Sequence, residues 1–150
     1  MKAFVMKSGS FVVAILVAGV AGSLFSTQFV LAGLTGLGVD VSIGNRLSMS
    51  VTDLRILETL APAVAAALLP AFVVAAICVR WIGGSRTIWF TVAGASAIVV
   101  ELLVIGSVLG LMPVAGARST MGLLGQGLAG ALGGFTYASM TAGGQAGEAA

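Results

Sequence analysis

The sequence predicts an all-α fold, a bundle of four transmembrane helices. Only 8% of its 150 residues are charged and 59% are hydrophobic, whereas a soluble domain carries about 25% charged residues. The hydrophobic residues form four long runs, and about 20 consecutive apolar residues are enough to cross a bilayer. These runs leave no room for a second domain. They cover residues 11–34, 57–79, 87–112 and 119–140.

The first run follows Lys2 and Lys7, an arrangement that also begins a secretory signal peptide. Its apolar character, however, continues through Phe25 and Leu31. The hydrophobic part of a signal peptide extends for only about 7 to 15 residues. We therefore expect residues 11–34 to be a retained helix.

The second run is preceded by the only substantial predicted loop, residues 35–52, where glycines and charged residues break the apolar pattern. Ser50, with Asp53 three residues later, resembles a capping box and predicts the start of the helix. Pro62 and Pro70 lie inside the run and should bend it. Neighbouring helices can satisfy the carbonyl groups that the prolines leave without a donor.

Short turns connect the remaining runs. Arg80 and Arg86 flank the turn before the third helix, and Pro113 turns the chain after it. Ser119 is the expected N-cap of the fourth helix. The tail, residues 141–150, consists mainly of glycine, alanine and glutamine, and we expect it to be flexible.

The basic residues of the loops predict the orientation, since cytoplasmic loops carry the excess of lysine and arginine. With the N-terminus inside, the inner side carries Lys2, Lys7, Arg80 and Arg86, and the outer side carries Arg46, Arg55 and Arg118. The excess is small but favours both ends of the chain on the inner side.

Small residues recur every four positions in the predicted helices, which lets helix backbones approach closely in a membrane. The first two helices carry the rows Ala14, Ala18, Gly22, Ser26 and Ala63, Ala67, Ala71, Ala75. The fourth helix has two such faces, Gly122, Gly125, Ala129, Gly133 and Gly127, Ala131, Gly134. Two small faces predict a neighbouring helix on each of two sides.

These rows fit tight packing within one bundle. The alternative is that one face contacts a second copy of the chain or another membrane protein, and the spacing alone does not separate the two. The glycines to which we assign a packing role are Gly106, Gly110, Gly122, Gly130, Gly133 and Gly134.

Residues 110–134 read GLMPVAGARSTMGLLGQGLAGALGG. This stretch resembles a group of small bacterial four-helix integral membrane proteins of no assigned function, and the resemblance covers the last two helices. It implies a multi-pass protein of a bacterial inner membrane. That group offers no functional residues to carry over, so the resemblance adds no mechanism.

Glu101 is the most costly residue of the predicted spans, because a charged group near the middle of a bilayer costs about 2.5–3.5 kcal/mol. No lysine or arginine lies at matching depth. If the third and fourth helices form an antiparallel hairpin, Gln126 lies within about one helical turn of that depth. Gln28 in the first helix is a further candidate. We therefore predict a buried polar site of Glu101, Gln126 and Gln28, with the carboxyl protonated and bonded to Gln126.

Three roles of Glu101 remain open. It can be a structural hydrogen-bonding group, a proton- or cation-binding carboxylate in a transport path, or a contact to another subunit or a lipid headgroup. The first role predicts a non-enzymatic structural or accessory membrane component. The second predicts a small proton- or cation-coupled carrier.

The composition argues against most enzymes and cofactors. The chain has no histidine, which excludes a Ser-His arrangement and the histidine ligands of haem and common zinc sites. The spans hold no acidic pair, and no basic cluster points to nucleic acid. Cys78 is the only cysteine and cannot form an internal disulfide. We expect no catalytic, cofactor or metal site, with the lipid bilayer as the partner.

Overall fold

The computed structural model describes residues 2–36, 44, 48–49, 51–52, 57–110 and 114–146. Within this part the chain is all-helical, as predicted, with four long helices and one short 3-10 helix. The long helices are α1 (Lys2–Gly36), α3 (Leu57–Trp81), α4 (Arg86–Leu109) and α5 (Thr120–Ala146), and the 3-10 helix is η2 (Ala115–Arg118).

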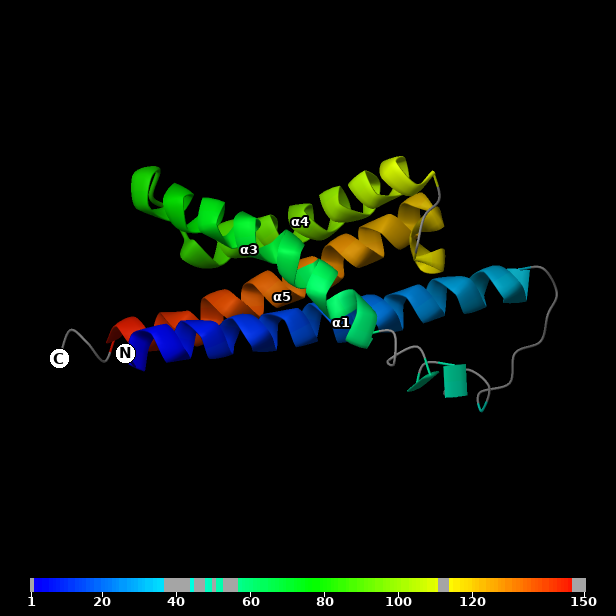
Figure 1. The fold of residues 1–150 in the computed structure, drawn as a ribbon, viewed down its shortest axis with the longest axis horizontal. Helices are drawn as coiled ribbons and strands as arrows, with labels where there is room; N and C mark the ends of the chain where they lie inside the picture. The colour runs from blue at the N-terminus through cyan, green and yellow to red at the C-terminus, as the bar shows by residue number, and fades with distance from the viewer. Residues whose placement is uncertain are drawn as a thin grey trace.

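Helix α5 is the centre of the arrangement. It lies alongside α1 on one side and α4 on another, and it runs in the opposite direction to both (Figure 1). Helix α3 packs against α4 and α1 and crosses them at an angle. The first residues of α1 and the last residues of α5 lie at the same end of the bundle (Figure 1).

Three of the helices are long and apolar enough to cross a membrane, in the segments Val5–Gly36, Ala61–Trp81 and Arg86–Val108. Their outward faces expose many large hydrophobic side chains, whereas soluble monomers rarely expose apolar patches above a few hundred Å². Helix α5 falls outside this group, and its eight glycines, three threonines and two glutamines account for its lower hydropathy. The all-helical prediction is thus confirmed, and three of the four predicted spans have the length and hydropathy that a membrane crossing needs.

Several helix ends differ from the predicted spans. Helix α1 begins at Lys2, well before residue 11. Helix α5 continues to Ala146, so the first part of the predicted flexible tail is helical. The buried Thr141 explains this difference, because its hydroxyl accepts a hydrogen bond of 2.6 Å from Arg86 and so ties the last turns of α5 to α4. The Ser50–Asp53 capping box lies outside the described residues.

Gly110 was predicted to pack against another helix, and the structure gives it a different role. It is the C-cap of α4, with φ 67°, a left-handed conformation that glycine adopts without strain. It is exposed, and a Cβ there would meet nothing within 4 Å. Helix α4 therefore ends at Leu109, before the predicted residue 112.

The predicted N-cap of the last helix is confirmed, since the Gly122 amide donates a hydrogen bond of 3.0 Å to the Ser119 hydroxyl. The turn between α3 and α4 depends on two glycines, Gly83 with φ 77° and Gly84 with φ 91°. The Trp89 indole closes it by donating a hydrogen bond of 3.0 Å to the Gly83 carbonyl.

One glycine face of α5 packs on the small-residue row of α1. A Cβ at Gly133 would lie 2.9 Å from both the Ala14 carbonyl oxygen and the Ala18 Cβ. A Cβ at Gly125 would lie 2.6 Å from the Phe29 ring. Real Cβ contacts are essentially never this short. At Gly133 glycine lets the two backbones come this close, and at Gly125 an added methyl group would displace the Phe29 ring.

A second face of α5 packs on α4 even more tightly. A Cβ at Gly130 would collide with the Gly94 carbonyl oxygen, and one at Gly94 would collide with that of Gly130. A Cβ at Gly134 would collide with the Phe90 carbonyl oxygen. Helix α5 therefore has a neighbour on each of two sides, as its two small-residue faces predict.

Aromatic rings hold the four helices together near the end where the chain begins. Each helix contributes one ring, Phe11 from α1, Phe72 from α3, Phe90 from α4 and Tyr137 from α5. Phe72 is the central ring, with centroid distances of 4.8 Å to Tyr137, 5.3 Å to Phe90 and 6.0 Å to Phe11. Such pairs contribute about 0.5–1.5 kcal/mol beyond their buried area.

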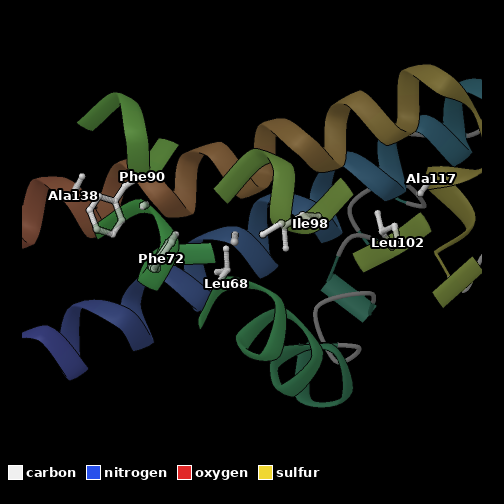
Figure 2. Close-up of a cluster of buried hydrophobic side chains, with 11 residues drawn as sticks. Leu68, Phe72, Phe90, Ile98, Leu102, Ala117 and Ala138 are labelled. Carbon is white, nitrogen blue, oxygen red and sulfur yellow. The ribbon is translucent and has the colours of Figure 1, made fainter. Parts of the chain in front are cut away.

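The aromatic rings continue into a buried apolar cluster that follows the bundle axis (Figure 2). The labelled members run in order from Ala138 and Phe90 through Phe72, Leu68 and Ile98 to Leu102 and Ala117.

Replacing Gly130 by alanine should lower the stability of the protein by about 1–3 kcal/mol, because the added methyl group overpacks the contact between α4 and α5. Gly33→Ala is the matched control, since a Cβ there meets nothing within 4 Å and helix propensity rises by about 1 kcal/mol. Thermal unfolding in detergent micelles compares the two variants. Equal unfolding midpoints would contradict the close approach of the two backbones.

Candidate functional site

The candidate site begins with the way α4 divides its surface between two neighbours. The row Phe90, Gly94 and Ile98, at four-residue spacing, faces α5. The adjacent row is shifted by one residue. It includes Ala97 and Glu101 and lines the space between α4 and α3. Glu101 lies at the border between these two faces, because it is three residues from Ile98, which contacts α5, and yet lines the groove shared with α3.

Between α3 and α4 lies a groove of about 710 Å³. Its α3 wall is the predicted alanine row, and its α4 wall carries alanines, valines and Glu101. The groove is lined by Ala63, Ala66, Ala67, Pro70, Ala71, Val74, Ala75, Cys78, Trp89, Val92, Ala93, Ser96, Ala97, Val100, Glu101, Val104 and Ile105. All of these residues belong to α3 and α4, so the groove opens on the side of the bundle.

Glu101 is the only ionisable carboxyl in this groove. It is partly buried, and within the described part of the chain its side chain has no hydrogen-bond or ion-pair partner. The Ser96 hydroxyl, which lines the same groove, already donates to the Ala93 carbonyl at 3.1 Å. The groove therefore presents an unpaired carboxyl in apolar surroundings, where any bound group that donates a hydrogen bond gains a partner.

The predicted bond between Glu101 and Gln126 is not formed. The Gln126 amide instead donates a hydrogen bond of 2.9 Å to the Gly22 carbonyl of α1, and Gln126 is only 6% exposed. A Cβ at Gly22 would lie 2.8 Å from the Gln126 side-chain oxygen, so an added methyl group there would displace the Gln126 side chain. Gln28 is exposed on α1. The structure thus separates the three predicted residues into three different places.

The groove was not predicted, although the sequence carries its signal. The row Ala63, Ala67, Ala71 and Ala75 indicates a helix face without bulk, and Pro70 interrupts the same helix. Small side chains on α3 opposite small side chains on α4 leave space rather than fill it. Among the described residues, no group of three or more histidine, cysteine, aspartate or glutamate side chains could hold a metal ion.

The chain is all-helical, and three of its helices are long and apolar enough to be compatible with a membrane protein. A scan of protein-family models and searches of curated proteins and solved structures find no match to it. The resemblance to small bacterial four-helix membrane proteins stays a prediction.

Replacing Gln126 by methionine should lower stability by about 0.6–2 kcal/mol, because the Gly22 carbonyl loses an interhelical hydrogen bond while side-chain size is nearly kept. Gln28→Met makes the same chemical change at an exposed site and should have little effect. Unfolding midpoints in detergent report both. A larger loss at Gln28 would show that the buried polar contact is elsewhere.

Proposed function

We propose that this chain crosses the inner membrane of a bacterium four times. Helix α5 has 27 residues and no charged side chain, and this length spans about 40 Å against about 30 Å of hydrocarbon. It lies between α1 and α4, which are themselves apolar enough to span. A helix in that position passes through the same depth as its neighbours. Its glycines, which lower its hydropathy, face those neighbours rather than lipid.

Both ends of the chain lie on the cytoplasmic side in this proposal. The end of the bundle with the first residues of α1 also carries Lys7, Arg80 and Arg86 around one depression. Arg118 lies at the opposite end, in η2. The positive-inside rule favours the more basic end as the cytoplasmic one.

Within the membrane, the chain acts as a non-enzymatic accessory component whose α3–α4 groove holds a transmembrane helix of another protein. The observation that carries this role is the unpaired Glu101 carboxyl in an otherwise apolar groove on the side of the bundle. Lipid tails offer no hydrogen-bond donor. A transmembrane helix can present a polar side chain at the same depth and approach closely over the alanines of α3.

A carrier is the second candidate, and one observation favours it. The groove volume of about 710 Å³ lies within the roughly 300–1,000 Å³ typical of small-molecule sites. Glu101 would then bind and release a proton or a cation. The tightly packed glycines of α5 oppose a path through the middle of the bundle, so such a carrier would need to work through the side groove.

Reporter fusions test the four crossings. A reporter that is active only outside the cytoplasm, placed after Met49, Gly84, Ala115 and Ala150, should read outside, inside, outside, inside. The last two positions bracket α5, the helix whose crossing is proposed. The same reading at Ala115 and Ala150 would contradict its crossing.

A photoreactive residue at Val100, exposed on the groove wall next to Glu101, should crosslink to one membrane protein in intact cells. Leu16, exposed on α1, is the control position and should not give this product. Because the partner bonds to the carboxyl, Glu101→Ala should reduce the crosslink at least tenfold, while Glu101→Gln, which keeps an acceptor and gains a donor, should retain it. The product is identified by mass spectrometry.

Other outcomes decide between the remaining occupants. A product of twice the chain mass would assign the groove to a second copy, and crosslinks to lipid alone would contradict the accessory role. If Glu101→Gln abolishes proton or cation flux in proteoliposomes of the purified chain, the carrier replaces the accessory component. A carrier requires a group that ionises, and the amide does not.

A further inference from the structure

A second depression in the surface differs from the α3–α4 groove in both place and charge. It measures about 810 Å³. Its lining residues come from the first turns of α1, the second half of α3, the start of α4 and the last turns of α5, which meet at the end of the bundle where α1 begins (Figure 1). Three cations line it, one from each of three helices: Lys7 of α1, Arg80 of α3 and Arg86 of α4. No acidic residue lines it. We call it the basic groove.

Arg86 is held in a fixed position at the inner wall of the basic groove. Its Nη2 donates a hydrogen bond of 2.6 Å to the Thr141 hydroxyl, and its guanidinium carbon lies 4.9 Å from the centre of the Phe90 ring. Its Nε is buried and has no hydrogen-bond partner. A buried donor without an acceptor is costly, so the guanidinium keeps a donor that the described residues do not use.

Lys7 and Arg80 differ from Arg86 because both are exposed. Within the described residues neither has an ion-pair partner. They can therefore move towards a bound anion from two sides while Arg86 stays in place. Three unpaired cations around one depression create a strongly positive potential, although the whole chain has a net charge of only +2.

Below the cations the basic groove is apolar. Its floor is the aromatic cluster of Phe11, Phe72, Phe90 and Tyr137, and its walls include Leu69 and Val73, both exposed. The charged rim lies at the helix ends, and the apolar part continues towards the middle of the spans. A ligand that fits both parts has an anionic head and an apolar tail.

We propose that the basic groove binds an anionic phospholipid, with its phosphate against Lys7, Arg80 and Arg86 and an acyl chain against Leu69 and Val73. Charge complementarity and the continuous apolar wall carry this assignment. Basic pockets between transmembrane helices bind anionic lipid headgroups in this manner. The proposal is independent of the Glu101 groove, because none of these five residues lines it.

The test uses the purified full chain in micelles of an uncharged detergent, titrated with phosphatidylglycerol, phosphatidylcholine or glycerol phosphate. Native mass spectrometry counts retained lipid, and thermal unfolding reports stabilisation. Phosphatidylglycerol should remain bound and raise the unfolding midpoint. Phosphatidylcholine, which has no net charge, and glycerol phosphate, which has no tail, should do neither at the same concentration.

Arg80→Gln should weaken phosphatidylglycerol binding about fivefold, which corresponds to about 1 kcal/mol per basic residue near an anionic lipid. Arg118→Gln is the matched control, since it also removes one exposed arginine but at the opposite end. It should leave the affinity unchanged. Both variants should unfold at the same temperature as the parent without lipid, which shows that the substitutions act on binding and not on folding.

Three results would overturn the proposal. Equal weakening by Arg80→Gln and Arg118→Gln would mean that the lipid is attracted by overall charge. Stabilisation by glycerol phosphate equal to that by phosphatidylglycerol would assign the groove to a soluble phosphate compound. Equal retention of phosphatidylcholine would mean that the apolar wall alone binds lipid.

Discussion

The contact between α4 and α5 at Gly94 and Gly130 brings one backbone directly against another. In a membrane, apolar area does not drive helices together, because lipid tails are as apolar as leucine. Association depends instead on dispersion contacts, which weaken steeply with distance. Gly94, Gly130 and Gly134 remove the side chains that would keep the backbones apart. The position of α5 between α1 and α4 depends on this contact and on its counterpart at Gly133.

Helix α3 shows the consequence of lacking such a contact. It carries alanines where α5 carries glycines, and only 17% of its span is buried, against 28% for α1 and for α4. Pro62 and Pro70 further limit how closely it can follow a neighbour. The α3–α4 groove and the basic groove both have α3 as one wall. Space for a ligand or partner therefore occurs where the tight glycine packing stops.

Local signals in the sequence were sufficient to predict the four long helices and to predict that α5 packs against a neighbour on each of two sides. Hydrophobic runs gave the four helices, Ser119 gave the start of α5, and two rows of small residues gave its two packed sides. These features depend on spacing along one helix.

The sequence did not predict how each helix is rotated about its own axis. The candidate site depended on that rotation, because it decides which neighbouring helix a given side chain faces. Glu101 and Ile98 are three residues apart, yet one faces α3 and the other faces α5. Glu101 lies seven residues after Gly94, which is nearly two full turns, so it stands at the border between the two faces and spacing alone does not assign it to either. The aromatic cluster was missed for a related reason, since its four rings come from four helices and no single helix shows the pattern.

The described charged side chains in the two grooves have a common property. Lys7, Arg80 and Arg86 line one groove and Glu101 lines the other, and among the described residues none of them forms an ion pair. Charges kept for structure within a membrane pair with one another or with backbone groups. Here the two signs are in different grooves, and both grooves open to the outside of the bundle. This separation is expected if the partners of these charges come from outside the chain, an anionic one at the basic groove and a hydrogen-bond donor at Glu101.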